Sequence, residues 1–250
     1  MANRFILNET SYFGAGARES LADEIKSRGF KKILFVTDKV LLECGVAKKV
    51  TDVMEKAGVA YDTYSEIKAN PTVKNVQDGV KLFKDCGADA LVAVGGGSVM
   101  DTAKGIGIII ANPEFSDVVS LEGVADTKNK SVPLIALPTT SGTAAEVTIN
   151  YVITDEANKK KMVCVDPHDI PVVAIVDSDL MMGMPKGLCA STGMDALTHA
   201  IEGYITPGAW EMSDMVEVKA IELIHQSLYD SVNGDPKARE TMALAQYIAG

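Results

Sequence analysis

Short apolar runs alternate with helix-like segments through the first two-thirds of the chain. Continuous apolar runs are typical of strands that are buried on both faces of a sheet. The strand-like runs are Arg4–Asn8, Lys32–Thr37, Ala60–Ser65, Ala90–Val94, Leu134–Leu137 and Val172–Val176. The segments with helical periodicity are Arg18–Arg28, Val46–Ala57, Pro71–Cys86 and Val99–Ile110. This alternation predicts an α/β fold with a mostly parallel sheet covered by helices on both faces.

The pattern changes beyond about Asp179. Before that point, Asn150–Thr154 and Lys161–Val165 flank a polar turn and predict a hairpin. After it, helix-like segments follow one another without a strand pattern between them: Lys186–Tyr204, Glu211–Tyr229 and Pro236–Gly250. We therefore predict an α/β domain over residues 1–178 and an all-helical domain over 179–250. The last helix runs to the final residue without a terminating signal, so we expect the helical domain to be incomplete.

Acidic residues outnumber basic ones, with 34 Asp and Glu against 24 Lys and Arg and a net charge of −10. Such a surface repels nucleic acid backbones and anionic membranes, so we expect neither as a partner. No apolar segment approaches the roughly 20 residues that span a bilayer, and the N-terminus has no secretory signal. Four cysteines without CxxC spacing fit a reducing compartment, and we expect a cytoplasmic protein: Cys44, Cys86, Cys164 and Cys189.

Three successive glycines and a serine, Gly95–Ser98, connect a buried strand to a helix. Glycines let a ligand approach the backbone closely, and the first amides of the helix are free to bind an anion such as pyrophosphate. The simpler alternative is a tight turn with Ser98 as the helix N-cap. Three glycines exceed what a turn needs, so we favour phosphate binding at this glycine turn, although it is not the GxGxxG fingerprint.

Two further segments follow strands. Asp38 could accept hydrogen bonds from an adenosine ribose and so favour NAD over NADP, but an Asp in this place is more often a helix N-cap. Thr139, Thr140, Ser141 and Thr143 form a hydroxyl loop that could hold cofactor phosphates or the nicotinamide ribose. Local capping of the segment that begins at Ala144 explains the same hydroxyls equally well.

Asp195 and His199 are four residues apart on a predicted helix and share one face. A carboxylate and an imidazole presented together are a common half-site for Fe²⁺ or Zn²⁺. The alternative is a hydrogen bond within the helix. Flanking small and apolar residues such as Ala196, Ala200 and Ile201 predict that the pair is buried, where an unneeded ionic pair would be costly.

These segments together resemble the group III, iron-dependent alcohol dehydrogenase family, and the resemblance runs through the whole chain. It is carried by Gly95–Ser98 with Asp101 and Lys104, by PTTSGTAAEV from Pro138, and by GMDALTHAIE from Gly193. Within the family, the stretches RFILNET, VTINYVITDE, VCVDPHDIP and HAIEGYITPGAW are most similar to members that interconvert lactaldehyde and propane-1,2-diol.

The resemblance implies a Rossmann-like, NAD-binding α/β domain, an all-helical metal domain and a site between them. It implies that Asp195 and His199 are metal ligands for Fe²⁺, with Zn²⁺ as the alternative, and are the catalytic pair. It implies a small aldehyde or diol as substrate and a homodimer. The cofactor-binding residues that it implies are Asp38, Asn70, Gly96, Gly97, Ser98, Asp101, Thr139, Thr140, Thr143, Val152, Lys161 and Leu180.

Members of this family continue beyond the position of Gly250 and take two further histidine ligands from that part. The resemblance therefore implies half a metal site here and impaired reduction of lactaldehyde by NADH. The alternatives are a butanol or 1,3-propanediol dehydrogenase of the same family, a zinc-using glycerol dehydrogenase or dehydroquinate synthase relative, and a non-catalytic NAD-binding fragment.

Overall fold

A parallel sheet forms the centre of the computed structural model, which describes residues 2–250. Six strands pair in the order β1-β9-β6-β4-β2-β3, and each of these pairs is parallel. Their bounds are β1 Thr10–Phe13, β2 Lys32–Val36, β3 Ala60–Tyr64, β4 Ala90–Gly95, β6 Leu134–Pro138 and β9 Val173–Val176. The predicted α/β fold with a parallel sheet is confirmed.

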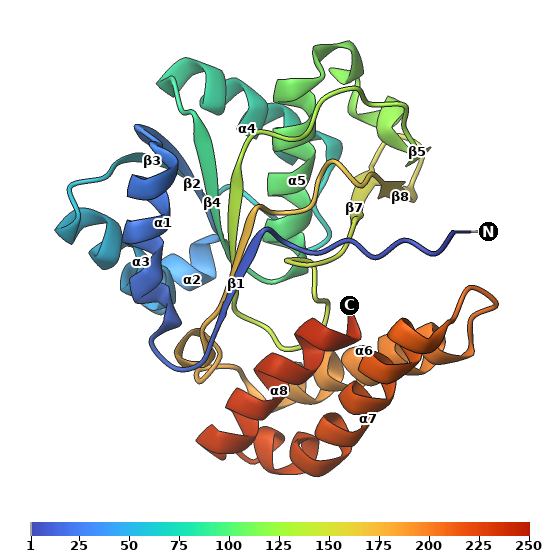
Figure 1. The fold of residues 1–250 in the computed structure, drawn as a ribbon. Helices are drawn as coiled ribbons and strands as arrows, with labels where there is room; N and C mark the ends of the chain where they lie inside the picture. Colours follow the sequence, from blue (N-terminus) through green and yellow to red (C-terminus); the bar gives the residue numbers. More distant parts are fainter. Residues whose placement is uncertain (1) are drawn as a thin grey trace.

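Helices cover both faces of this sheet (Figure 1). Side chains alternate along β2, so that Ile33 and Phe35 pack with one helical layer and Leu34 and Val36 with the other. The first layer holds α1 Leu21–Arg28 and α3 Val46–Lys56, and the second holds α4 Val73–Cys86 and α5 Gly97–Ala111. The short elements are α2 Lys39–Glu43, η1 Ala17–Ser20, η2 Pro113–Phe115, η3 Val118–Leu121 and η4 Ser178–Leu180.

The strand predicted over Arg4–Asn8 is wrong, because the edge strand begins at Thr10. In the register of β1 with β9, Asn8 would lie opposite Pro171, which has no N–H to donate to a neighbouring strand. The Asn8 side chain donates instead to the carbonyl oxygens of Pro171 and Glu146, at 2.7 and 2.8 Å. The apolar run Phe5–Leu7 is therefore not part of a strand.

A second, three-stranded sheet has the order β5-β8-β7. Its strands β7 Asn150–Asp155 and β8 Lys160–Val165 are antiparallel, which confirms the predicted hairpin, and β5 is the short Gly123–Val124. Tyr151, Ile153 and Met162 pack into the same core as α4 and α5. The hairpin is thus fixed beside the N-terminal half of α5.

Three helices form a layer at one end of the large sheet (Figure 1): α6 Lys186–Ile205, α7 Glu211–Val232 and α8 Pro236–Ala249. We call them the helical layer. A cluster of apolar residues joins the layer to the sheet, with Val176 at the end of β9 packed together with Met181, Ala243 and Tyr247. The C-terminus of α8 lies between the two parts of the molecule.

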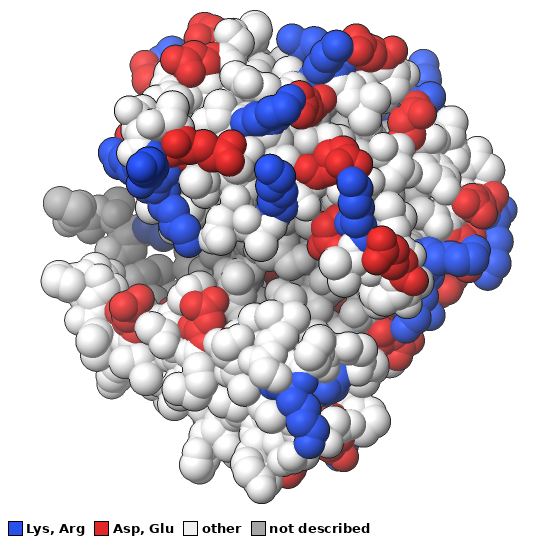
Figure 2. Space-filling model, turned by 180° about the vertical axis from the view of Figure 1, so that it is seen from behind, with Lys and Arg blue, Asp and Glu red and all other residues white. Residues whose placement is uncertain are grey.

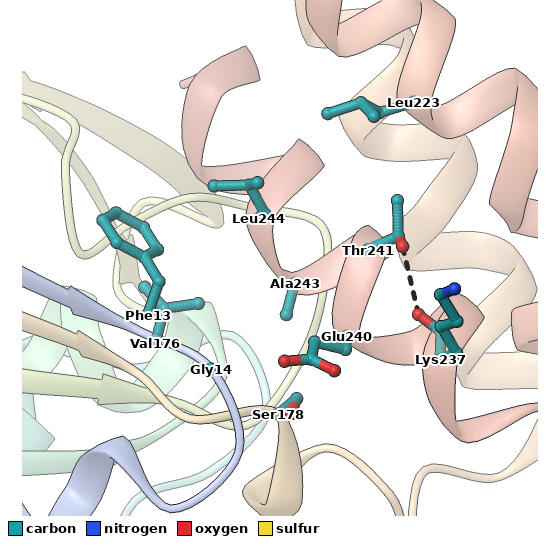
Figure 3. Close-up of a pocket in the computed structure, with 10 residues that line it drawn as sticks. All are labelled: Phe13, Gly14, Val176, Ser178, Leu223, Lys237, Glu240, Thr241, Ala243 and Leu244. Carbon is teal, nitrogen blue, oxygen red and sulfur yellow. Dashed lines mark hydrogen bonds between the residues drawn. The ribbon is translucent and has the colours of Figure 1, made fainter.

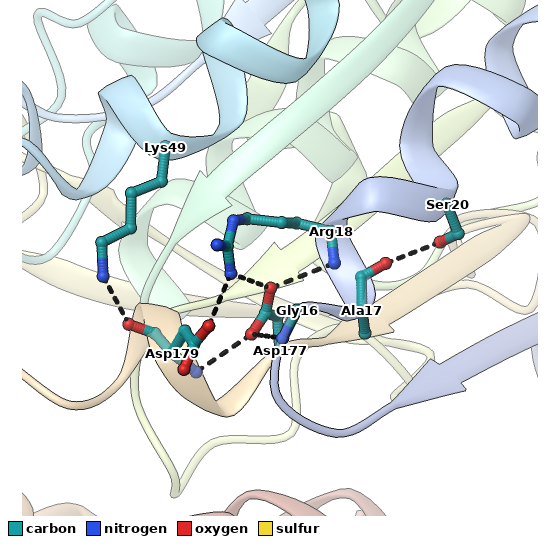
Figure 4. Close-up of polar contacts among 7 residues, drawn as sticks. All are labelled: Gly16, Ala17, Arg18, Ser20, Lys49, Asp177 and Asp179. Carbon is teal, nitrogen blue, oxygen red and sulfur yellow. Dashed lines mark hydrogen bonds and ion pairs between the residues drawn. The ribbon is translucent and has the colours of Figure 1, made fainter.

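A buried carboxylate fixes the place where the chain leaves the sheet (Figure 4). Asp177 accepts hydrogen bonds from the backbone amides of Gly16 and Arg18 and from the Arg18 guanidinium, at 2.7 to 3.0 Å. Arg18 also pairs with Asp179 at 2.9 Å, and Lys49 donates to the Asp179 carbonyl at 2.9 Å. These contacts hold the turn after β1 against the segment that leads into the helical layer.

Charged side chains are unevenly distributed on the surface. Figure 2 shows Lys, Arg, Asp and Glu spread over the α/β part, whereas the helical layer below it has large uncharged areas on this face. Exposed apolar side chains on α6 and α7 include Met194, Ile201, Tyr204, Ile205, Met212, Met215 and Val218.

Among the described residues 2–250, none of the helices has the length and apolar character needed to cross a bilayer.

Candidate active site

The glycine turn lies where β4 ends and α5 begins. Gly96 is the N-cap residue of α5, and the helix starts at Gly97, so the alternative with Ser98 as N-cap is wrong. A Cβ added to Gly96 would lie 3.2 Å from Thr140, and one added to Gly97 would lie 3.1 Å from Thr143. The glycines therefore allow the hydroxyl loop to approach the first, unpaired amides of α5.

The hydroxyl loop lies between α5 and the helical layer. The Thr139 amide donates to the Gly95 carbonyl at 3.0 Å, which continues the pairing of β6 with β4. At the other end, a Cβ on Gly142 would lie 2.5 Å from the Thr192 carbonyl oxygen of α6. The loop thus contacts both the glycine turn and the helix that carries the Asp–His pair.

Asn70 meets the glycine turn from the loop before α4. The backbone amide of Asn70 donates to the Ser98 hydroxyl oxygen at 3.3 Å, and its backbone carbonyl accepts from the Thr154 hydroxyl at 3.5 Å. Asn70 has a left-handed backbone with φ of 56°, which is uncommon for a residue other than glycine. This backbone conformation holds the segment against the first turn of α5.

Asp195 and His199 lie one turn apart on α6, with Oδ1 of Asp195 3.9 Å from Nε2 of His199. The predicted burial of the pair is wrong, because their side chains are 45% and 34% exposed. The buried stripe of α6 consists of Cys189, Gly193, Ala196 and Ala200. The pair lies beside that stripe and remains accessible to a ligand.

One cavity of about 280 Å³ brings several of these groups together. We call it the site cavity. It is lined by Gly97, Asp101, Thr143, Ala145, Thr148, Asn150, Tyr151, Val152, Val163, Asp195 and His199. The glycine turn, the hydroxyl loop, the hairpin and α6 each contribute to its wall. Gly97, Asp101, Thr143, Val152, Asp195 and His199 had all been predicted as site residues.

Eight of the twelve predicted cofactor residues are not in the lining of the site cavity: Asp38, Asn70, Gly96, Ser98, Thr139, Thr140, Lys161 and Leu180. Asp38 follows β2, next to β4, and its Oδ1 accepts from the Leu41 amide at 2.9 Å as the N-cap of α2. Lys161 is exposed on β8, and Leu180 is buried in the core beneath α3. Asp38 therefore has the capping role that the sequence favoured, at the same edge of the sheet as the glycine turn.

A buried lysine supports the wall of the site cavity. Lys104 lies one turn after Asp101 on α5 and donates to the carbonyl oxygens of Thr148 and Asn150, the latter at 3.0 Å. Its ammonium group is 3.8 Å from the buried carboxylate of Asp169. Thr148 and Asn150 were not predicted as site residues, although they lie in the stretch VTINYVITDE. Lys104 was named with the glycine turn, but no role was predicted for it; it interrupts the apolar helix that follows Asp101.

Asp101 joins α5 to the hairpin. Its Oδ2 accepts from the Val152 amide at 3.1 Å. Burial raises the pKa of the Asp101 carboxyl to about 6, although Lys104 and the Val152 amide favour the charged form. Burial likewise raises the pKa of Asp169 to about 7. The site cavity therefore has in its wall a carboxyl group whose pKa is raised toward neutrality by burial.

A second and larger cavity, about 380 Å³, lies between the end of β1 and the helical layer (Figure 3). We call it the edge cavity. Its wall consists of Phe13, Gly14, Val176, Ser178, Leu223, Lys237, Glu240, Thr241, Ala243 and Leu244. The Ser178 hydroxyl is buried, and Glu240 and Lys237 come from the first turns of α8. These residues are different from those predicted for the site.

Models of one protein family match both parts of the chain. The model for iron-containing alcohol dehydrogenases matches residues 8–178, and the model for the C-terminal part of the same family matches residues 189–250. The chain belongs to the iron-containing alcohol dehydrogenase family. The resemblance found in the sequence is thereby confirmed.

Individual members of the family are similar over the full chain. Lactaldehyde reductase of Escherichia coli (strain K12) is 60% identical over 250 residues, which cover 100% of this chain and 65% of that protein. The crystal structure of a 1,3-propanediol oxidoreductase matches with a TM-score of 0.96 at 37% identity, over 100% of this chain and 65% of that one. The crystal structure of a sulfoacetaldehyde reductase from Bifidobacterium kashiwanohense, in complex with NAD⁺, matches with a TM-score of 0.90 at 32% identity. The match covers 100% of this chain and 66% of that one. The chain thus spans slightly less than two thirds of the length of these relatives.

Proposed function

We propose that the chain carries the cofactor half and part of the metal site of an NAD-linked, iron-dependent alcohol dehydrogenase that interconverts lactaldehyde and propane-1,2-diol. The observation that supports this most strongly is the site cavity, whose single wall includes the glycine turn, the hydroxyl loop and the Asp195–His199 pair. The choice of substrate rests on the 60% identity to a lactaldehyde reductase.

NAD fits the carboxyl edge of the sheet. The first amides of α5 suit the pyrophosphate, and the hydroxyls of Thr139, Thr140 and Thr143 suit the phosphates or the nicotinamide ribose. Asp38 follows the neighbouring strand β2 and suits the adenosine ribose, and its charge disfavours a 2′-phosphate. The remaining proposed contacts are Asn70, Gly96, Gly97, Ser98, Asp101, Val152, Lys161 and Leu180.

A divalent metal fits between Asp195 and His199. Ligand bonds of about 2.1 Å each span up to about 4.2 Å, so donor atoms 3.9 Å apart can reach one ion. A bound ion would supply Lewis-acid polarisation of a carbonyl oxygen, and bound NADH would supply the hydride. Carboxylate and imidazole ligands accept both iron and zinc, and we propose iron on the strength of the family.

The residues of the chain would act by positioning. Asp195 and His199 fix the carbonyl end of the substrate on the α6 side, while Gly97 and Thr143 hold the cofactor on the α5 side of the same cavity. Such positioning contributes strongly to rate when the reacting groups are held in contact. Asp101, with its pKa of about 6, places a group that can exchange a proton in that wall.

We infer that the 250-residue chain binds metal weakly and turns over slowly. Within residues 2–250 there is no cluster of three or more His, Cys, Asp or Glu side chains able to hold a metal ion. Metal analysis of purified protein, together with an NADH-linked lactaldehyde assay, tests the inference. We expect substoichiometric metal and low activity, and tightly bound stoichiometric iron with normal turnover would contradict it.

A dehydrogenase for 1,3-propanediol is the second candidate, because the structure of a 1,3-propanediol oxidoreductase matches with a TM-score of 0.96. A panel of lactaldehyde, 3-hydroxypropanal and butanal, each with NADH, separates the two. We expect the highest kcat/KM with lactaldehyde.

We also propose that residues 1–178 form a dinucleotide-binding domain and 179–250 part of a metal-binding helical domain, that the protein is cytoplasmic, and that it forms a homodimer. The four cysteines are free thiols, which suits a reducing compartment. β1 leaves one side of the sheet unpaired at its edge, where a second copy could pair. Light scattering coupled to size exclusion tests the dimer, with a discrete mass twice that of the chain expected.

A further inference from the structure

Gln246 is a buried side chain of α8 whose hydrogen bonds cross to the α/β part. Its Oε1 accepts from the Ala144 amide at 2.9 Å. Its Nε2 donates to Oε1 of Glu146 and to the Ala243 carbonyl at 3.4 Å. Gln246 and Glu146 are almost completely buried. A buried amide is costly unless it is hydrogen-bonded, so the position of α8 is tied to Ala144 and Glu146.

Ala144 follows the hydroxyl loop directly and has a left-handed backbone, with φ of 49°. A residue with a Cβ is strained in this region and keeps the conformation only where its surroundings impose it. On the preceding side, Gly142 packs on Thr192 of α6, and Thr143 packs on Gly97. The segment is therefore held by α5, α6 and α8 together. The bond from α8 is made to the amide of the strained residue, whose carbonyl accepts from the Val147 and Thr148 amides.

We propose that Gln246 is a positioning residue for the cofactor. It holds Ala144 in its left-handed conformation and so keeps Thr143 against Gly97, in the wall that also includes Asp195 and His199. This inference rests on the proposed function, because it assigns Gln246 a role in binding NADH. Through this side chain, together with the contact of Gly142 with Thr192, the helical layer contributes to the shape of the hydroxyl loop.

The first test compares Gln246→Met with Gln226→Met in the 250-residue chain. Gln226 is an exposed glutamine on α7, so the control makes the same chemical change away from the loop. NADH affinity is measured by calorimetry, and hydrogen exchange of residues 140–148 is measured by mass spectrometry. We expect Gln246→Met to weaken NADH binding at least tenfold and to speed exchange in that segment, with the control unchanged. Equal NADH affinity of Gln246→Met and wild type would overturn the proposal.

The second test exchanges the donor and the acceptor. Gln246→Glu places two carboxyl groups together and should weaken NADH binding as strongly as Gln246→Met does. Combining it with Glu146→Gln restores both bonds, because a carboxylate at 246 accepts from Ala144 and from the new amide at 146. We expect the double variant to recover to within about threefold of wild type. A double variant that remains as weak as Gln246→Glu would count against positioning.

The outcomes separate this proposal from the proposed function. If wild type itself gives no heat with NADH, the proposed function fails and the role of Gln246 in cofactor binding fails with it. If wild type binds and the Gln246 variants bind equally well, only the positioning role fails. Should Gln246→Met not fold, Gln246→Asn keeps the amide but withdraws it from Ala144, and the same two results decide.

Discussion

Two cavities lie between the α/β part and the helical layer, and six of the fourteen predicted site residues line the smaller one. The edge cavity is larger, about 380 Å³, and much of its wall is apolar, with Phe13, Val176 and Leu244 among its residues. The site cavity, about 280 Å³, has a glycine backbone, hydroxyls, carboxylates and an imidazole in its wall. Polar groups that converge from separate elements give a site its specificity, and volume alone does not.

Removing a lysine beside the site cavity should lower the free energy of unfolding more than removing one beside the edge cavity. Lys104 is buried behind the site cavity, and Lys104→Met leaves the Asp169 carboxyl and two carbonyls without their partner. We expect the free energy of unfolding to fall by about 3 kcal/mol. Lys237→Met, at the edge cavity, should change it by less than about 0.5 kcal/mol. Urea denaturation at pH 8 measures both, and equal effects would remove the contrast.

Metal affinity should depend on the site cavity alone. We expect His199→Ala to weaken Fe²⁺ or Zn²⁺ binding at least about 100-fold, since even the loss of an outer hydrogen-bond partner costs 10- to 100-fold. His225→Ala, on the exposed face of α7, is the matched control and should bind as wild type. Titration calorimetry under anaerobic conditions gives both affinities. Unchanged binding in His199→Ala would place the metal elsewhere.

Cofactor affinity should be sensitive to a side chain in the glycine turn. Gly97→Val introduces a side chain whose Cβ is already 3.1 Å from Thr143. We expect NADH binding to weaken roughly 30-fold, about 2 kcal/mol. Gly183→Ala is the control, because a Cβ there has open space around it. Fluorescence titration with NADH distinguishes the two, and a Gly97→Val chain with wild-type affinity would argue against phosphate at the turn.

The choice between NAD and NADP should depend on Asp38. Asp38→Ser retains a side chain able to cap α2 but removes the negative charge. We expect the ratio of NADPH to NADH affinity to rise about tenfold. Competition binding of the two nucleotides measures the ratio. An unchanged ratio would leave Asp38 with its capping role only.

The smallest effect is expected at the edge cavity. Glu240→Gln removes a charge from its wall, and we expect NADH and metal affinities to stay within about twofold of wild type. The same calorimetric titrations apply. A clear loss of either affinity would show that the two cavities are coupled.

The sequence predicts the strands and helices well because their signals are local. The apolar runs around Lys32–Val36 and Ala90–Gly95 are buried on both faces, and the glycines between β4 and α5 leave room for the close approach of the hydroxyl loop. Arg4–Asn8 has a similar apolar run, but its pairing depends on the segment just before β9, where Pro171 would lie opposite Asn8. Local pattern cannot reveal the partner that a strand will meet.

The sequence predicted several residues of the site, but it did not predict how buried they are or which residues pack around them. The face of α6 that is buried follows from how α7 and α8 pack, and this is why Asp195 and His199 are more exposed than their small neighbours indicated. Gln246 and Lys104 act through partners far away in the chain. A short stretch of sequence does not reveal such tertiary contacts. The one local sign is a single charged residue, Lys104, in an otherwise apolar helix.

The pairing of β1 with β9 has a consequence for how this protein is made. Thr10 pairs with Val173, so most of the chain lies between the two partners. During translation β1 is the first strand to leave the ribosome, and it remains unpaired until β9 has been synthesised. Pairings of such long range slow folding. We expect the four strands β6-β4-β2-β3 to assemble on the nascent chain before β1 pairs with β9.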